Sequence, residues 1–147
     1  MSRETVNLAI VFADISGSTR LYETLGDSIA RSLVWQCRDI MTVQINKFEG
    51  TVIKTIGDEI MCTFPSAELA VEASMGMQEV ITYDLPNLNE NTPTSLTIRV
   101  GLHYGSAILE GGDVFGDAVN VAARMVGFAK GGQIITTQQT AEELPPV

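Results

Sequence analysis

The sequence has few of the residues on which disulfide-rich, zinc-binding and nucleic-acid-binding proteins depend. Its two cysteines, Cys37 and Cys62, lie far apart and form no CxxC pair, which favours buried thiols over a disulfide or a zinc site. Nine basic residues stand against 18 acidic ones, a net charge of −9, which makes the chain a poor general binder of nucleic acid and of anionic membranes. An anionic substrate would need local compensation by metal ions, Lys or Arg.

Long apolar runs are also absent, since no segment reaches the roughly 18–20 apolar residues that a membrane span needs. Residues 1–6 show no basic region followed by an apolar stretch, so no secretion signal is visible. We therefore expect a cytoplasmic protein without a membrane span. The 147 residues, 45% of them hydrophobic, suit one compact domain, and neither an internal repeat nor a domain linker is evident.

Hydrophobic periodicity predicts a chain of strands and helices. The first predicted strand, 6–13, is apolar on both faces, as expected of a central strand that is buried on both sides of a sheet. The other predicted strands are 51–56, 60–64, 95–104 (continued by 106–110 after a bend at Gly105) and 133–136. The predicted helices are 20–48 in two pieces hinged near Gly26, 67–82 with Ser66 as N-cap, and 117–129.

Three further expectations concern the loop and the core. Residues 83–94 contain two Pro and three Asn and are predicted to form a loop. Trp35 and the methionines are predicted to lie in the core. The inner face of the last helix is predicted to carry Val119, Ala122, Ala123 and Val126.

The order of the elements is β-αα-β-β-α-β followed by β-α-β. This order predicts an α+β fold with a ferredoxin-like core (βααββαβ) and an appended βαβ extension. In that topology the first strand lies beside the third, so its C-terminal end meets the hairpin turn at residues 57–59. We therefore expect Asp14 and Asp58 to be neighbours, although they are distant in the sequence.

Two carboxylates at one edge of a sheet repel each other. At about 4 Å and an effective dielectric constant near 20, this repulsion costs roughly 4 kcal/mol. A cation or a shared proton relieves it, and hard divalent ions such as Mg²⁺ prefer oxygen ligands. Taken from spacing alone, the simpler interpretation is that Asp14 caps the following helix and that Asp58 only supplies a turn.

Other polar residues have both a functional and a structural interpretation. Residues 16–19 precede a helix, where backbone N–H groups can hold phosphate oxygens. Asn120 and Arg124 share a helix face and could bind an anion, or they could simply be solvated. Lys54 fits a solvated edge of a sheet, and His103, the only histidine, fits a packed or surface residue better than a catalyst.

Three segments together resemble the motifs of class III adenylate and guanylate cyclases. Residues 12–19 resemble their first metal motif, and residues 48–58 resemble the second, with Lys54 four residues before Asp58. Residues 113–124 resemble their transition-state motif. The match covers nearly the whole chain in the right order, which makes it specific.

The resemblance assigns each group of residues a role. It implies a site for two Mg²⁺ or Mn²⁺ ions, made by Asp14, Asp58 and the carbonyl group of Ile15. Phosphate contacts are implied for Gly17, Ser18 and Thr19. Adenine would be read by Lys54 and Asp113, the ribose would be oriented by Asn120, and charge on the α-phosphate would be stabilised by Arg124.

The implied activity is the conversion of ATP to 3′,5′-cyclic AMP and pyrophosphate, with active sites shared across a homodimer. Guanylate cyclases often carry Glu and Cys in place of Lys54 and Asp113, so GTP remains an alternative substrate. A non-catalytic, dimerising regulatory module is a second alternative. A diguanylate cyclase is a third, prompted by residues 56–59, but it gives no reason for the Lys54–Asp113 pair.

The resemblance implies a single catalytic domain over residues 1–147. Family members usually continue to a strand with a further phosphate-binding Lys, whereas the last Lys here is Lys130. We therefore expect this length of chain to lack those C-terminal strands, which leaves its activity in isolation open. Any regulatory domain is expected after the C-terminus.

Overall fold

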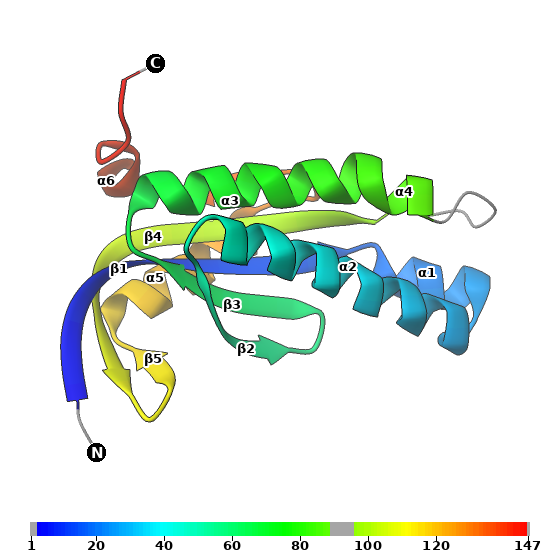
Figure 1. Ribbon diagram of the computed structural model, residues 1–147, viewed down its shortest axis with the longest axis horizontal. Coiled ribbons are helices and arrows are strands. Elements are labelled where there is room, and N and C mark those ends of the chain that lie inside the picture. The colour runs from blue at the N-terminus through cyan, green and yellow to red at the C-terminus, as the bar shows by residue number, and fades with distance from the viewer. Residues whose placement is uncertain (1–2, 89–95, 147) are drawn as a thin grey trace.

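The computed structural model describes residues 3–88 and 96–146, and within them a mixed sheet forms the centre of the fold (Figure 1). The strands follow the order β2-β3-β1-β4-β5, and β6 pairs with β4. Among the strand pairs formed by the described residues, β4–β6 alone is parallel. The strands are β1 (Arg3–Ser16), β2 (Thr51–Ile56), β3 (Glu59–Phe64), β4 (Thr97–Glu110), β5 (Asp113–Phe115) and β6 (Ile134–Thr136).

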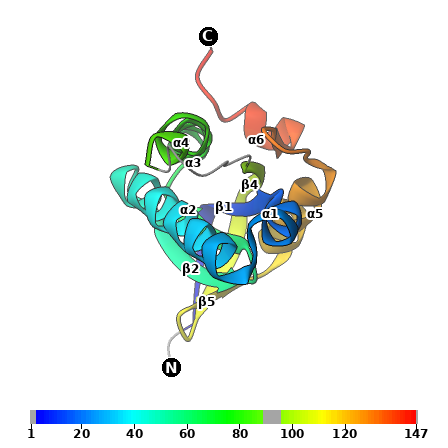
Figure 2. The same cartoon turned by 90° about the vertical axis from the view of Figure 1, so that its right-hand side faces the viewer.

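Helices cover both faces of this sheet. Figure 2 shows α2 and α3 on one side of it and α5 on the other. The helices are α1 (Ser18–Leu25), α2 (Asp27–Lys47), α3 (Ala67–Glu79), the π-helical turn η1 (Val80–Asp84), α4 (Leu85–Leu88), α5 (Asp117–Phe128) and α6 (Gln138–Ala141). None of the helices in the described part of the chain combines the length and the apolar character needed to cross a bilayer.

The central strand β1 is buried on both faces, as its sequence predicts. Ala9, Val11 and Ala13 face the larger core, which α1, α2 and α3 complete. Ile10 and Phe12 face a smaller core that contains residues of α5. Gly101 of β4 permits α5 to approach closely, because a Cβ atom there would lie 2.0 Å from the backbone nitrogen of Val126.

The predicted fold class is confirmed, and with it most of the predicted elements. The helix expected at 20–48 does break at Gly26, whose φ is 83°, and the Oγ of Ser66 accepts a hydrogen bond from the Leu69 N–H at 3.2 Å. Both cysteines are buried, and burial raises the pKa of the Cys37 thiol to about 12. The bend expected at Gly105 does not interrupt the sheet, because β4 runs through it to Glu110.

Several predictions are wrong. Residues 80–88 of the chain are helical, whereas a loop was expected from residue 83; Pro86 stands in the first turn of α4, where proline is tolerated. The rest of that expected loop, 89–95, lies outside the described residues. Trp35 and Met75 are each 59% exposed, so they are not core residues, and Ala123 is exposed on the outer side of α5.

Candidate active site

The C-terminal end of β1 brings together residues from distant parts of the chain. Asp14 lies opposite Glu59 of β3 on one side and opposite Arg99 of β4 on the other. The backbone N–H of Ile15 donates to the carbonyl oxygen of Asp58 at 3.1 Å, which fixes the β2–β3 turn beside β1. The expected proximity of Asp14 and Asp58 is therefore confirmed, and it follows from the pairing of β1 with β3.

Each of the two carboxylates has a partner of its own. The Ser18 hydroxyl donates to Oδ2 of Asp58 at 2.6 Å, and the Arg99 guanidinium forms an ion pair with Oδ2 of Asp14. Negative charge is nevertheless concentrated at this edge. Burial raises the pKa of Glu59 and the charge of Asp14 raises it further, while Arg99 acts in the opposite direction. The arrangement favours a cation at this edge.

The loop between β1 and α1 has the geometry of an anion site. Gly17 has a φ of 93°, a left-handed conformation that suits glycine, and it stands at the N-cap of α1. The first N–H groups of a helix lack intrahelical acceptors and attract anions. Ser18 is buried and its hydroxyl already binds Asp58, whereas Thr19 is exposed. Ser18 therefore couples this loop to the carboxylates.

Lys54 and Asp113 form an ion pair between the two outermost strands of the β2-to-β5 path. The distance from Nζ of Lys54 to Oδ2 of Asp113 is 3.1 Å. In a flat sheet, five strands would place their outer members roughly 19 Å apart, so the sheet must curve strongly to allow this contact. Figure 1 shows β2 and β5 along the same lower side of the molecule.

Local features affect the direction of the Lys54 side chain and the pKa of Asp113. The register of β2 against β3 shifts between Val52 and Lys54, and such a bulge redirects the side chains that follow it. The N–H of Val114 donates to Oδ1 of Asp113 at 2.7 Å. That hydrogen bond and the neighbouring Lys54 lower the pKa of Asp113. Both side chains remain partly exposed, 43% for Lys54 and 32% for Asp113, so a ligand can reach them.

Asn120 and Arg124 lie on the exposed side of α5. The buried side of this helix carries Ala118, Ala122 and Val126, which pack on the sheet. Neither the Asn120 side chain nor the Arg124 side chain makes a hydrogen bond or ion pair with another residue in 3–88 or 96–146. Both polar groups are therefore free to meet something outside this protomer's described residues.

The predicted site residues fall into three groups. One is the carboxylate edge with the α1 loop, the second is the Lys54–Asp113 pair, and the third is the exposed face of α5. Figure 1 places α1 toward one end of the molecule, the β2–β3 turn nearer the middle and β5 toward the other end. No hydrogen bond or ion pair between described residues links the three groups.

The donor set at the carboxylate edge is compatible with a divalent cation that also binds a substrate. Within the described ranges, no cluster of three or more His, Cys, Asp or Glu side chains could hold a metal ion alone. Asp14 and Asp58 provide carboxylate oxygens, and the Ile15 carbonyl group is the further oxygen that the sequence suggests. Mg²⁺ is commonly bound by one or two carboxylates, with substrate phosphates completing its coordination.

Arg99 is the functional candidate that sequence reasoning missed. It lies in a strand between the fully buried residues Ile98 and Val100, and it pairs with Asp14. The available signal was a charged residue in the middle of an otherwise apolar strand. His103, by contrast, is packed as expected: it is 7% exposed, and its Nδ1 lies 2.9 Å from the Thr137 hydroxyl.

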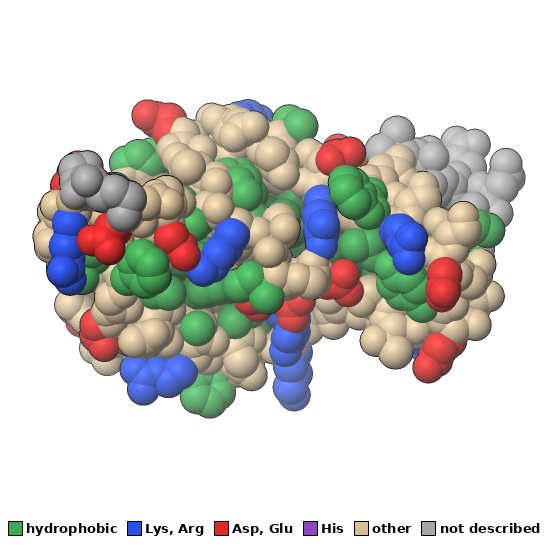
Figure 3. Space-filling model, turned by 90° about the horizontal axis from the view of Figure 1, so that it is seen from below, with side chains coloured by type: hydrophobic (Ala, Val, Ile, Leu, Met, Phe, Trp, Pro, Cys, Tyr) green, Lys and Arg blue, Asp and Glu red, His purple; other side chains and the backbone are tan. Residues whose placement is uncertain are grey.

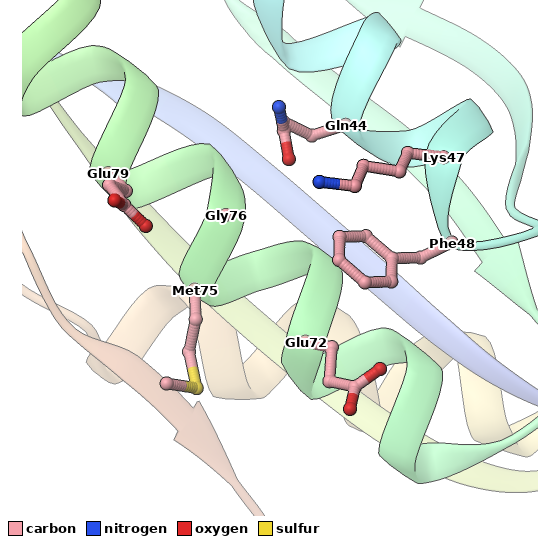
Figure 4. Close-up of a pocket in the computed structure, with 7 residues that line it drawn as sticks. All are labelled: Gln44, Lys47, Phe48, Glu72, Met75, Gly76 and Glu79. Carbon is pink, nitrogen blue, oxygen red and sulfur yellow. The ribbon is translucent and has the colours of Figure 1, made fainter.

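Two further features of the surface are the distribution of charge on one face and a groove between α2 and α3. Figure 3 shows one face on which basic and acidic side chains are interspersed with hydrophobic ones, so charge is balanced locally there. Figure 4 shows a groove between α2 and α3 that contains none of the predicted site residues. Its lining consists of Gln44, Lys47, Phe48, Glu72, Met75, Gly76 and Glu79.

Known proteins share both the sequence pattern and the fold. The chain matches the adenylate and guanylate cyclase catalytic domain family over residues 1–146. It is 31% identical over 137 residues to an adenylate cyclase of Streptomyces coelicolor, a match that covers 93% of this chain and 34% of that protein. A putative adenylate cyclase of Rhizobium meliloti is also 31% identical over 137 residues, with 91% of this chain and 23% of that protein covered.

Solved structures agree with this match. The adenylyl cyclase CyaB of P. aeruginosa superposes with a TM-score of 0.86 over 97% of this chain and 82% of that one, at 23% identity, which shows the fold. An adenylate/guanylate cyclase/hydrolase of Silicibacter pomeroyi gives a TM-score of 0.75 at 32% identity, over 95% of this chain and 79% of that one. The chain belongs to the class III adenylate and guanylate cyclase family. It spans about a third or less of the length of the curated relatives described above.

Proposed function

We propose that this domain is an adenylate cyclase, which converts ATP to 3′,5′-cyclic AMP and pyrophosphate. The observation that carries the choice of ATP is the 3.1 Å contact between Lys54 and Asp113. Together they offer a donor and an acceptor side by side. A Lys donor suits a ring nitrogen of adenine and an Asp acceptor suits its exocyclic amine, whereas guanine presents a carbonyl oxygen in place of that amine.

In the proposed reaction, the ribose 3′ oxygen bonds to the α-phosphorus and passes its proton to solvent water. The bond between the α-phosphorus and the bridging oxygen breaks, and pyrophosphate leaves. Divalent ions held by Asp14, Asp58 and the Ile15 carbonyl group would lower the pKa of the 3′-hydroxyl and neutralise phosphate charge. The contact of Ser18 with Asp58 supports a coupling between the cation site and the phosphate loop.

Cationic side chains would balance the remaining phosphate charge. Arg99, beside Asp14, is near enough to the carboxylate edge to bind a phosphate that enters there. Arg124 would act on the α-phosphate, where charge develops, and Asn120 would orient the ribose. An Arg in such a role contributes about 10³–10⁵ in rate in other phosphoryl-transfer enzymes.

We further propose that two copies of the chain complete each active site. The separation of the carboxylate edge from β5 supports this arrangement (Figure 1), as does the exposure of Asn120 and Arg124. In a twofold-symmetric dimer, the carboxylate edge of one protomer would face the Lys54–Asp113 pair and the α5 face of its partner. Such a dimer contains two equivalent sites.

The decisive experiment compares ATP with GTP as substrates in the presence of Mn²⁺. We expect cyclic AMP from ATP and much slower formation of cyclic GMP. A variant with Lys54→Glu and Asp113→Cys should move the preference toward GTP. Equal rates with the two nucleotides in the native chain would contradict the choice of ATP, and absence of both products would favour the non-catalytic alternative.

A further inference from the structure

Arg38 of α2 contacts the turn that carries Asp58. Its Nη2 donates a hydrogen bond to the carbonyl oxygen of Gly57. Its guanidinium lies over the ring of Trp35, with 5.9 Å between Cζ and the ring centroid. Its Nε is buried and has no hydrogen-bond partner in the described part of the chain. The hydrogen bond to the Gly57 carbonyl oxygen therefore holds this guanidinium at the turn.

The Gly57–Asp58 turn has one peptide group outside the strand ladder. Ile56 pairs with Glu59, so Gly57 and Asp58 are the two central residues of the hairpin. Gly57 has a φ of 58° and Asp58 has a negative φ, which is the pattern of a hairpin turn with glycine in the first central position. The peptide between them can rotate without breaking any strand pair. Its rotation would change the direction of the Asp58 side chain.

Three hydrogen bonds from three different elements hold this turn. The Ile15 N–H of β1 donates to the Asp58 carbonyl oxygen at 3.1 Å, and the Ser18 hydroxyl of α1 donates to the Asp58 carboxylate at 2.6 Å. Arg38 of α2 is the one that binds the rotatable central peptide. The face of the exposed Trp35 ring gives the guanidinium a second contact, a cation–π interaction.

We propose that Arg38 is a positioning residue that sets the orientation of the Gly57–Asp58 peptide and so aims the Asp58 carboxylate at the cation site beside Asp14. The inference rests on the proposed function, because it takes Asp58 as a metal ligand. Groups that orient a metal ligand typically change metal affinity by about 10–100-fold when they are removed. Loss of Arg38 should therefore weaken metal binding rather than unfold the domain.

The test compares Arg38→Gln and Arg38→Lys with Arg31→Gln as a matched control. Arg31 is an exposed arginine about two turns earlier on α2, so its removal changes the same charge on the same helix. Mn²⁺ binding is titrated by electron paramagnetic resonance. Hydrogen exchange of the Ile15 amide is followed by NMR, because this N–H reports the position of the turn without reference to activity.

We expect Arg38→Gln to weaken Mn²⁺ binding about 10–100-fold and to speed Ile15 exchange, with thermal unfolding close to that of the native chain. Arg38→Lys should restore part of the Mn²⁺ affinity and part of the protection of the Ile15 amide. Arg31→Gln should change neither the Mn²⁺ affinity nor the Ile15 exchange rate. Unchanged Ile15 exchange in Arg38→Gln would overturn the inference, as would equal losses of Mn²⁺ affinity in Arg31→Gln. If the native chain itself binds no Mn²⁺, the proposed function fails, while Ile15 exchange still decides whether Arg38 orders the turn.

Discussion

The carboxylate edge and the outer face of α5 are organised in opposite ways. At the carboxylate edge, β1, β3, β4 and the α1 loop converge, and Asp14 and Asp58 already have partners in Arg99 and Ser18. On α5, Asn120 and Arg124 are exposed, and their side chains make no polar contact with the described residues. The first region is preorganised by its own chain. The second is positioned by α5, but its polar side chains have no partner among the described residues.

The two halves of the proposed active site are ordered by different parts of the structure. Asp14 and Asp58 are held by strand pairing, and strand pairing within one chain is sufficient to bring them together. Arg124 is held only by the packing of the opposite side of α5 against the sheet. A ligand that needs both regions must therefore bridge two surfaces, which a second protomer would supply.

The largest expected effect separates binding from turnover on α5. Arg124→Ala should lower kcat by about 10³–10⁵, roughly 4–7 kcal/mol of barrier, because Arg124 is proposed to act on charge that develops in the transition state. Because Arg124 is exposed, thermal unfolding should stay close to that of the native chain. Steady-state kinetics with ATP and Mn²⁺ measure the loss, and a native turnover rate would remove Arg124 from the mechanism.

Asp58→Asn tests the carboxylate edge by its effect on metal binding and turnover. The substitution keeps the size of the side chain and an oxygen that can accept from Ser18 but removes the charge that a cation needs, so Mn²⁺ affinity and kcat should both fall by about 10³. Metal titration of the rate gives the change. Persistent activity at low Mn²⁺ would defeat the assignment of Asp58 to the cation site.

A mixture of these two variants tests whether the two regions come from different protomers. If each site takes its carboxylates from one protomer and Arg124 from the other, random mixing makes half of the dimers mixed, each with one intact site. An equimolar mixture of Asp58→Asn and Arg124→Ala chains should therefore recover about a quarter of the native rate. A mixture no more active than its components would show that the two regions belong to the same protomer's site.

Lys54→Ala should have a more moderate effect. Loss of a hydrogen bond that involves a charged group costs about 1.5–3 kcal/mol, so kcat/KM with ATP should fall about 10–100-fold. Since Asp113 would lose its cationic neighbour, its lowered pKa should rise toward the ordinary value. Comparison of ATP and GTP kinetics, with NMR titration of Asp113, measures both changes. Equal losses for ATP and GTP would mean that Lys54 does not read the base.

The smallest expected effect lies away from both regions, at His103. Burial lowers the pKa of His103, and the charge of Asp117 only partly opposes this, so the folded state binds a proton less readily than the unfolded chain. The resulting stability is complete above the ordinary pKa of 6.5 and is lost as the pH falls from there toward the lowered value. The slope is at most about 1.4 kcal/mol per pH unit.

Urea unfolding of the native chain and of His103→Gln between pH 5 and 8 measures this slope. The variant should lose the part of the pH dependence that arises from His103. Identical pH profiles for the two proteins would show that the histidine is protonated equally in the folded and unfolded states.

The outcome for individual residues shows what the sequence pattern can and cannot reveal. The meeting of Asp14 with Asp58 was predictable, because the order of strands dictates which strand ends share an edge. The pairing of Arg99 with Asp14 was not, because it depends on the register between β1 and β4. Trp35 was expected in the core, whereas it lies on the exposed side of α2 with its ring against the Arg38 guanidinium.

Sequence patterns alone were enough to predict most of the elements and their order, since hydrophobic spacing, glycines and capping residues act locally; the helical residues 83–88 and the short helix α6 were not predicted. From that order followed the ferredoxin-like core and the position of the two carboxylates. The contacts between side chains of distant strands that no motif indicates, such as the one between Arg99 and Asp14, emerged from the folded structure alone. The physical reason is that sheet curvature and strand register come from the packing of the whole core, and no short segment of the chain contains that information.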